Sequence, residues 1–229
     1  MTALLSRGTL TPSVEDYLKA IYRLSAADRP ASTSEIANLL ELSAASVSGM
    51  VKRLSEQGLL EHVPYKGAQL TPEGRRVALR MVRRHRLIES YLVEFLGYSW
   101  DTVHEEAERL EHAVSDLLVE RMATMLGHPT VDPHGDPIPD EDGSIHEVAC
   151  TPLSDIPVGA TVAIHRVAEH APDRLRYLAS LGLRPGVVLT VLDRQPFEGP
   201  VTVLAGGEDR TIGRELADVL LCGREAGDR

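Results

Sequence analysis

Two stretches in the middle of the chain combine imidazoles and carboxylates at spacings that suit a divalent-metal site. Two His-x-x-x-Glu pairs are followed, in phase with the second pair, by a Glu-His dipeptide. On an α-helix such positions stack on one face, so two adjacent helices could direct these groups at shared points. Imidazole and carboxylate without thiolate suit Mn(II), Fe(II), Co(II) or Zn(II). The residues concerned are His85, Glu89, His104, Glu108, Glu111 and His112.

The alternative to a metal site is a charged, solvated helix surface. Charged pairs four residues apart are common on exposed helices, so a single His-x-x-x-Glu pair would favour that alternative. Two pairs and a Glu-His dipeptide in phase favour a metal site instead.

Composition limits what kind of protein carries these groups. The 229 residues suit one or two domains with a small appendage, and with 43% hydrophobic residues but only 2 Phe and 1 Trp the core must be aliphatic. No apolar run approaches the ~18 residues of a membrane span, and Arg7 interrupts any signal-peptide pattern. Cys150 and Cys222 do not make a disulfide framework, so we expect reduced thiols in a cytoplasmic protein.

The charge is distributed unevenly along the chain. Residues 1–86 carry 13 Lys and Arg against 8 Asp and Glu, a net charge of +5. The remaining residues carry 11 against 26, a net charge of −15, which gives −10 for the whole chain. A basic amino-terminal third joined to an acidic remainder is typical of a DNA-binding module attached to a regulatory one.

The basic third opens with three helix-start signals. Thr11-Pro12 begins the first helix, a capping box at Ser32 begins the second, and Ser43 begins a third that Gly58 ends. Two short helices joined by a tight turn indicate a helix-turn-helix, with a plain helical hairpin as the alternative. A hairpin with a basic tip at Pro64-Tyr65-Lys66-Gly67 then resembles the wing of a winged helix.

The rest of the chain divides into helices, a linker and strands. Thr71-Pro72 opens a long helix to about Leu96, and a second helix is expected from Asp101 through the Glu-His dipeptide and onward to Leu118. Residues 127–144 contain four prolines and predict a linker. Beyond Cys150, short β-branched runs and one helix predict a small β-barrel. The expected runs are Thr161–Ile164, Val187–Leu192 and Val201–Leu204, with the helix around Arg174–Leu181.

Four motifs in these elements resemble the diphtheria-toxin-repressor family of metal-dependent transcriptional regulators, and within it the manganese-sensing branch. The motifs are Val14–Leu18, Arg84–Glu89, Val103–Glu108 and Glu111–Asp116. The resemblance covers nearly the full chain and implies a mainly α fold with a small β domain. It implies a winged helix-turn-helix DNA-binding domain over 1–74, a helical metal-binding and dimerisation domain with a proline-rich linker over 75–146, and an SH3-like (FeoA-like) β-barrel over 147–229.

The same resemblance implies two metal sites per subunit. The primary site would be formed by Asp16, Glu108, Glu111 and His112. The ancillary site would be formed by His85, Glu89 and His104, completed by a carboxylate of the SH3-like domain, for which Glu169 is the best match. His170 adjoins Glu169 and stays open between a ligand and a structural residue. The other histidines are expected to be solvated or structural: His62, His128, His134, His146 and His165.

DNA reading is expected on the helix that begins at Ser43. Its first turns carry small groups that allow close approach to the major groove, with selectivity resting partly on DNA shape and thymine methyls. These are Ser43, Ala44, Ala45, Ser46, Ser48 and Gly49. We expect Lys52, Arg53 and Lys66 to hold phosphates.

The leading functional hypothesis is a homodimeric repressor of metal-uptake genes that Mn(II) activates and that binds a palindromic operator in double-stranded DNA. Fe(II) is the alternative activator, and Co(II) or Zn(II) is expected to substitute in vitro. No membrane partner and no small organic substrate are expected. A metal-dependent hydrolase is a second hypothesis, although nothing resembles a nucleophile elbow, HExxH or a phosphate loop. A third is a winged-helix regulator whose acidic clusters are only charge on the dimer surface.

Overall fold

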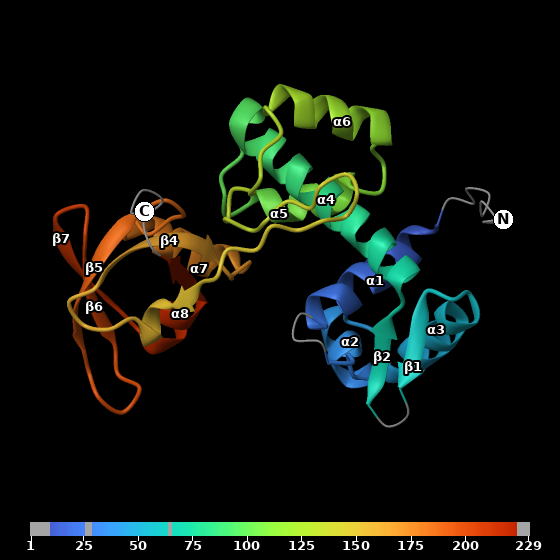
Figure 1. The fold of residues 1–229 in the computed structure, drawn as a ribbon, viewed down its shortest axis with the longest axis horizontal. Coiled ribbons are helices and arrows are strands. Elements are labelled where there is room, and N and C mark those ends of the chain that lie inside the picture. Colours follow the sequence, from blue (N-terminus) through green and yellow to red (C-terminus); the bar gives the residue numbers. More distant parts are fainter. Residues whose placement is uncertain (1–9, 26–28, 64–65, 224–229) are drawn as a thin grey trace. The chain divides into compact units, whose positions relative to one another are not determined.

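The computed structural model describes residues 10–25, 29–63 and 66–223, and its chain divides into two compact units (Figure 1). The first unit comprises residues 1–84 and 139–144, and the second comprises 85–138 and 145–229. The long helix α4, Pro72–Leu96, contributes residues to both. Because each unit is compact in itself, each is described separately.

The first unit is three helices followed by a β-hairpin. Its elements are α1 (Pro12–Leu24), α2 (Thr33–Leu39), α3 (Ala44–Glu56), β1 (Leu60–Val63) and β2 (Gly67–Leu70). Ser32 Oγ accepts from the Glu35 N–H while Glu35 Oε2 accepts from the Ser32 N–H, at 3.2 and 2.9 Å, so the predicted capping box is present. Ser43 Oγ accepts from the Ser46 N–H and caps α3. Gly58, at φ +73°, follows the end of α3 as expected.

An aliphatic core holds these elements together. Leu18, Ile36 and Leu54, from the three helices, are completely buried in it. The β1–β2 hairpin is antiparallel, and its predicted tip residues Pro64 and Tyr65 lie outside the described residues. Burying one such side chain contributes about 1.5–3 kcal/mol to the stability of the fold. This burial holds α3 against the hairpin and leaves the outer face of α3 open.

The helical part of the second unit contains the end of α4, α5 (Val103–Leu110) and α6 (Asp116–Met125). The expectation of one continuous helix from Asp101 through Leu118 is wrong, because α5 ends at Leu110. Ser115 then caps α6, its Oγ accepting from the Leu118 N–H, and a serine at this position favours a new helix start over continuation. Glu111 and His112 therefore lie in the turn after α5.

The proline-rich linker has a defined path that hydrogen bonds within the segment stabilise. Asp132 Oδ1 accepts from the backbone N–H of His134 and of Asp136, at 2.8 and 3.0 Å. The His134 carbonyl accepts from the Val167 N–H, so the linker lies against the β-domain. Gly135, at φ +85°, sits where a Cβ would come within 1.9 Å of the His165 carbonyl oxygen. Only glycine fits this contact, which fixes the path of the linker.

The β-domain is an antiparallel sheet of six strands in the order β3-β8-β4-β5-β6-β7. The strands are β3 (Thr151–Pro152), β4 (Thr161–Val167), β5 (Val188–Arg194), β6 (Val201–Ala205), β7 (Glu208–Ile212) and β8 (Leu220–Gly223). A short 3₁₀ turn (Leu153–Asp155) and the helices α7 (Pro172–Ser180) and α8 (Arg214–Val219) complete it. The core is aliphatic, as composition required, and the predicted domain order of winged helix, helical domain and small β-barrel is confirmed. Among the described residues, no helix is long and apolar enough to cross a bilayer.

Candidate metal centre

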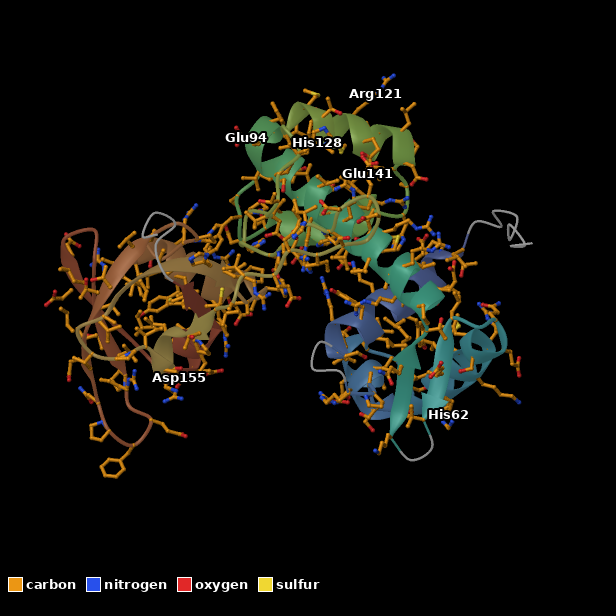
Figure 2. The ribbon with its side chains drawn as sticks, viewed as in Figure 1. His62, Glu94, Arg121, His128, Glu141 and Asp155 are labelled. Atoms are coloured by element: carbon orange, nitrogen blue, oxygen red, sulfur yellow. The ribbon has the colours of Figure 1, made fainter. Side chains whose placement is uncertain are left out.

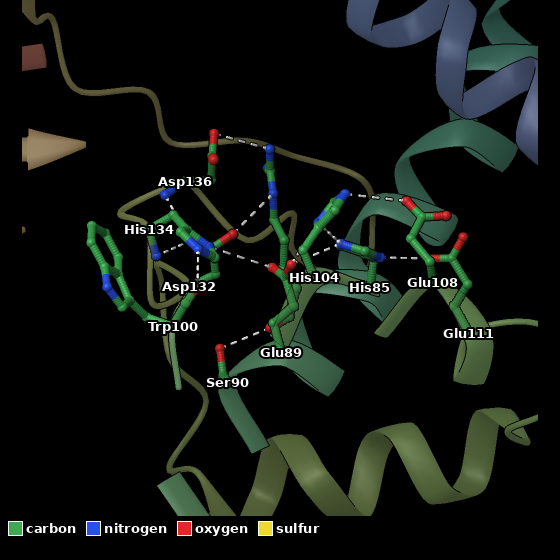
Figure 3. Close-up of polar contacts among 11 residues, drawn as sticks. His85, Glu89, Ser90, Trp100, His104, Glu108, Glu111, Asp132, His134 and Asp136 are labelled. Atoms are coloured by element: carbon green, nitrogen blue, oxygen red, sulfur yellow. Dashed lines mark hydrogen bonds and ion pairs between the residues drawn. The ribbon is translucent and has the colours of Figure 1, made fainter. Parts of the chain in front are cut away.

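Three of the predicted ancillary ligands converge between α4 and α5 (Figure 3). The His85 and Glu89 side chains lie one helical turn apart on α4, with His85 Nε2 3.0 Å from Glu89 Oε1. From α5, His104 Nδ1 lies 2.9 Å from the same carboxylate oxygen and 3.0 Å from His85 Nε2. His85 and Glu89 are buried, so these donors are held in a water-poor environment where a cation would be strongly attracted.

His85 and His104 also contact residues that were predicted for the primary site. His85 Nδ1 lies 2.6 Å from Oε2 of Glu111, which is completely buried. His104 Nε2 lies 3.6 Å from Glu108 Oε1, and ligand atoms of His85, His104 and Glu108 lie within 4.8 Å of one another. The structure thus places donors from the two predicted sites in one continuous cluster.

Asp16 and His112 complete the set predicted for the primary site. Asp16 is a half-buried residue of α1 in the first unit, and its approach to the ligands of the second unit stays a prediction. His112 lies in the turn after α5, with Nε2 3.5 Å from Glu111 Oε1. Within the second unit, Glu111 therefore has an imidazole on each side, His85 and His112, which suits a carboxylate that shares a cation with them.

A third cluster, which the sequence analysis did not identify, joins Glu89 to the linker. Glu89, Asp132 and His134 are all buried, with ligand atoms within 4.8 Å of one another (Figure 3). His134 Nε2 donates to the Trp100 carbonyl at 2.7 Å, so Nδ1 is the ring nitrogen that could face a metal ion. That Nδ1 is buried without a hydrogen-bond partner in the described part of the chain, 3.9 Å from Glu89 Oε2. A histidine fixed by a carbonyl at one nitrogen, with the other open, has the arrangement of a metal ligand.

The pKa values of the two carboxyl groups in this linker cluster shift in opposite directions. Burial favours the neutral form of Glu89, but the charges and hydrogen bonds of His85, His104 and His134 outweigh it and hold its pKa well below the usual range. Burial raises the pKa of Asp132 well above its usual range, and the nearby charges of Asp136 and Glu89 raise it further against the opposing Arg86. The two carboxyl groups of one site therefore differ in how readily they ionise, and a divalent ion would favour the ionised form of both.

Glu169, predicted as the last ancillary ligand, directs its carboxylate at the backbone just before α7 and at Arg174. Oε1 accepts from the N–H groups of His170 and Ala171 at 2.8 and 2.9 Å, and Oε2 accepts from Arg174 at 3.0 Å. The neighbouring His170 ring stacks on His104, with centroids 4.7 Å apart. A ligand role for Glu169 stays a prediction, whereas the His170 ring contacts His104, one of the predicted ligands.

The sequence offered a weak signal for the two residues that were missed. Asp132 and His134 form an Asp-x-His triplet, but it lies in a segment without helical or strand periodicity. His134 was expected to be solvated or structural, and it is only 1% exposed. Its position depends on the contact of the linker with β4, which no local pattern specifies.

The small residues predicted to read DNA lie on the exposed surface of α3. Two of their hydroxyl groups bond to α3 itself. Ser43 Oγ caps the helix and lies 2.9 Å from Ser46 Oγ, whereas Ser48 Oγ donates to the Ala44 carbonyl. Gly49 has nothing within 4 Å of where a Cβ would be. The exposed set also includes Ala45, Lys52, Arg53 and, beside β2, Lys66.

Comparison with known protein families gives three matches along the chain. Residues 9–68 match the description "iron dependent repressor, N-terminal DNA binding domain". Residues 71–140 match "iron dependent repressor, metal binding and dimerisation domain", and residues 151–222 match the FeoA domain. The three matches follow one another in the order of the structural elements described above.

Individual proteins are similar over nearly the whole chain. The iron-dependent repressor IdeR of Mycobacterium leprae is 32% identical over 220 residues, which cover 91% of this chain and 95% of that protein. The diphtheria toxin repressor of Corynebacterium diphtheriae is 31% identical over 221 residues, covering 92% and 96%. A solved manganese-dependent transcriptional repressor in complex with manganese is 41% identical, with a TM-score of 0.86, covering 92% of this chain and 99% of that chain. The manganese regulator SloR is 36% identical with a TM-score of 0.75, covering 94% and 100%.

Proposed function

Because this chain belongs to the family of metal-dependent transcriptional repressors that includes IdeR and the diphtheria toxin repressor, we propose that Mn(II) activates it to bind operator DNA as a homodimer. In this proposal residues 1–74 bind DNA, 75–146 bind metal and dimerise, and 147–229 form the SH3-like domain. Relatives with iron and with manganese in their names are both similar to this chain, so the choice of metal rests on its own donor atoms.

The donor set supports manganese. The buried clusters offer only imidazole nitrogens and carboxylate oxygens, and among the described residues both cysteines lie in the β-domain segment rather than in a cluster. Hard oxygen donors with imidazole suit Mn(II), whereas a thiolate would favour softer ions. The observation that carries the proposal is His134 Nδ1, which is buried, has no hydrogen-bond partner among the described residues and lies 3.9 Å from Glu89 Oε2. A bound cation would interact with both groups.

The surrounding residues fix how the ligands are held. When bound, Mn(II) would supply the positive charge that keeps buried carboxylates close together. The Trp100 carbonyl holds His134 in one tautomer, and Arg86 lies 3.2 Å from Asp136 and 3.6 Å from Asp132, which anchors the linker beside α4. His85 joins Glu89 to Glu111, so occupancy at one end of the cluster alters the charge felt at the other.

Activation requires that the metal also engage the DNA-binding module. In the proposed primary site Asp16 alone comes from that module, while Glu108, Glu111 and His112 come from the helical domain. A metal held by both would fix the spacing of the two recognition helices of the dimer at the operator repeat, about 34–36 Å or a multiple. Without metal the carboxylates repel one another, and affinity falls with the fraction of molecules that have the right spacing.

A patch of exposed apolar side chains on the helical domain supports the dimer. Leu117, Leu118 and Met125 on α6 are 65%, 43% and 58% exposed, and Phe95 and Leu96 at the end of α4 are similarly exposed. Residues this apolar are normally covered, and the patch lies within the segment that matches a dimerisation domain. We assign the patch to contact with a second copy of the chain.

Fluorescence anisotropy with promoter duplexes tests the proposal. The full-length protein should bind a duplex from upstream of a metal-uptake gene with Mn(II) present, and release it in excess chelator. DNA binding that is unchanged by chelator would instead support the alternative of a winged-helix regulator whose acidic clusters are only charge on the dimer surface. A parallel anaerobic titration with Fe(II) decides between manganese and iron, the alternative that the iron-named relatives favour.

A further inference from the structure

We infer, on the basis of the proposed function, that an open hollow on the flank of α3 seats a backbone phosphate of DNA and that His62 is one of its contacts. The hollow has a volume of about 570 Å³ and lies within the DNA-binding module. Its walls come from α2, α3 and β1. The lining residues are Thr33, Ser48, Val51, Lys52, Ser55, Glu56 and His62.

The position of the hollow on α3 decides which part of DNA would enter it. Ala45, Gly49 and Arg53 lie four residues apart along one exposed stripe of the helix, and Ser48, Lys52 and Glu56 form the adjacent stripe. A helix about 10–12 Å across fills a major groove about 12 Å wide, so its flanks meet the phosphate chains rather than the base edges. Ala45 and Gly49 on the first stripe can reach bases, and Arg53 farther along it is left for a phosphate. The second stripe, with the hollow, faces backbone, so Ser48 lies toward the phosphates rather than among the base-facing groups.

The chemistry of the lining suits one phosphate. Lys52 is an exposed cation, and the Thr33 hydroxyl and the His62 imidazole offer hydrogen-bond donors from two other elements. The Ser48 hydroxyl already donates to the Ala44 carbonyl, which leaves Thr33, Ser55 and His62 as donors. Ser55 Oγ is buried and has no hydrogen-bond partner in the part of the chain that the structure describes. His62 is an exposed residue of β1, one strand of the wing hairpin (Figure 2). Phosphate contacts of this kind position a protein on DNA without reading sequence.

One residue in the hollow opposes the phosphate. Glu56 is exposed at the end of α3 and brings a negative charge to the same wall as Lys52. Glu61 is a matched control for Glu56. It is also exposed and precedes His62 on β1, but it does not line the hollow. Replacing either glutamate by glutamine removes one negative charge. If DNA affinity rises more for the Glu56 variant than for the Glu61 variant, the difference comes from the hollow and not from the net charge.

The experiment uses the full chain with Mn(II) and a duplex that the wild-type protein selects from random sequence. His62→Ala should weaken binding to this duplex and to an unrelated one by a similar factor, about tenfold, since a hydrogen bond to a charged group is lost. Glu56→Gln should tighten binding to both duplexes more than Glu61→Gln does. His62→Gln, which keeps a donor, should recover most of the affinity.

Single neutral methylphosphonates placed along the duplex then locate the contact. At one position in each half-site the neutral linkage should weaken wild-type binding and have much less effect on His62→Ala, because that contact is already missing. Thermal unfolding of each variant checks that the module remains folded. Unchanged affinity in His62→Ala, or a loss confined to one sequence, overturns this inference but leaves the proposed function intact. Failure of the wild-type protein to bind any duplex with Mn(II) overturns the proposed function itself.

Discussion

Nδ1 of His85 lies 2.6 Å from Oε2 of Glu111, while Nε2 of the same ring lies 3.0 Å from Oε1 of Glu89. One imidazole therefore contacts carboxylates that the sequence assigned to two different metal sites. A metal ion bound at one nitrogen of the ring would change what the other nitrogen offers to its carboxylate. The two predicted sites would therefore share a residue and should not fill independently.

His85→Ala should consequently weaken Mn(II) binding at both sites, by at least about tenfold, the usual effect of removing a ligand or its support. Glu89→Gln, which lies on only one side of the ring, should weaken one site more than the other. Isothermal titration calorimetry and the electron paramagnetic resonance signal of free Mn(II) give the stoichiometry. A His85→Ala protein that keeps one site at full affinity would contradict the coupling.

Glu108→Cys should shift the ranking of activating metals toward Fe(II) or Co(II). The substitution places a sulfur donor beside His104, which lies 3.6 Å from Glu108 in the wild-type protein. The measurement is DNA binding at saturating concentrations of each metal, because raw metal affinity follows the Irving–Williams order whatever the activation. Glu108→Asp, which keeps an oxygen donor, is the control. If the cysteine variant ranked the metals as wild type does, Glu108 would not select the metal.

Asp16→Ala should abolish Mn(II)-dependent operator binding while leaving the fold and the dimer intact. The change removes the one primary ligand expected from the DNA-binding module, so metal would no longer fix the spacing of the recognition helices. Circular dichroism and analytical ultracentrifugation check fold and dimer, and anisotropy measures binding. Retention of strictly Mn(II)-dependent operator binding in this variant would refute the mechanism.

Gly49→Ala should stabilise the protein and weaken its binding to DNA. An alanine in an exposed helix is favoured over glycine by about 0.5–1 kcal/mol, and no atom lies within 4 Å of the added methyl group. The same methyl group would stand between α3 and the base edges. Denaturant unfolding and anisotropy measure the two effects, and unimpaired DNA binding by Gly49→Ala would place the groove elsewhere on α3.

Stability should fall between about pH 9 and pH 12 partly because of Cys222. Burial, with a smaller effect of Cys150, raises the pKa of Cys222 to about 12. In this range the unfolded chain loses the thiol proton and the folded chain keeps it, so rising pH favours unfolding by at most about 1.4 kcal/mol per unit. Urea unfolding at pH 8.5 and 10.5 should show a smaller loss for Cys222→Ala than for wild type. Equal losses of stability in the two proteins would mean that the Cys222 thiol ionises as readily in the folded protein as in the unfolded chain.

Much of the first unit could be predicted because its signals are local. The capping residues Ser32 and Ser43 and the glycine at Gly58 act on backbone within a few positions, and the structure has helix ends at each. The start of α6 also had a local signal, Ser115, but the apolar spacing on either side favoured one continuous helix. Here the cap outweighed the periodicity.

The linker cluster could not be predicted in the same way. Asp132 and His134 reach Glu89 only because Gly135 lets the linker pass close to His165 and because Val167 binds the His134 carbonyl. These are contacts between residues about thirty positions apart, set by tertiary packing rather than by spacing. Resemblance to the family indicated which residue types to look for, and only the fold located this pair.

In the proposed dimer, the apolar patch on α6 makes the DNA-binding activity of the regulator depend on the concentration of the protein itself. When folding and pairing are linked, the fraction of competent protein rises with protomer concentration as well as with ligand. A cell that holds few copies would leave some chains unpaired, with Leu117 and Met125 facing water, and those chains could not occupy a palindrome however much metal was present. Gene dosage would therefore shift the metal concentration at which transcription is shut off.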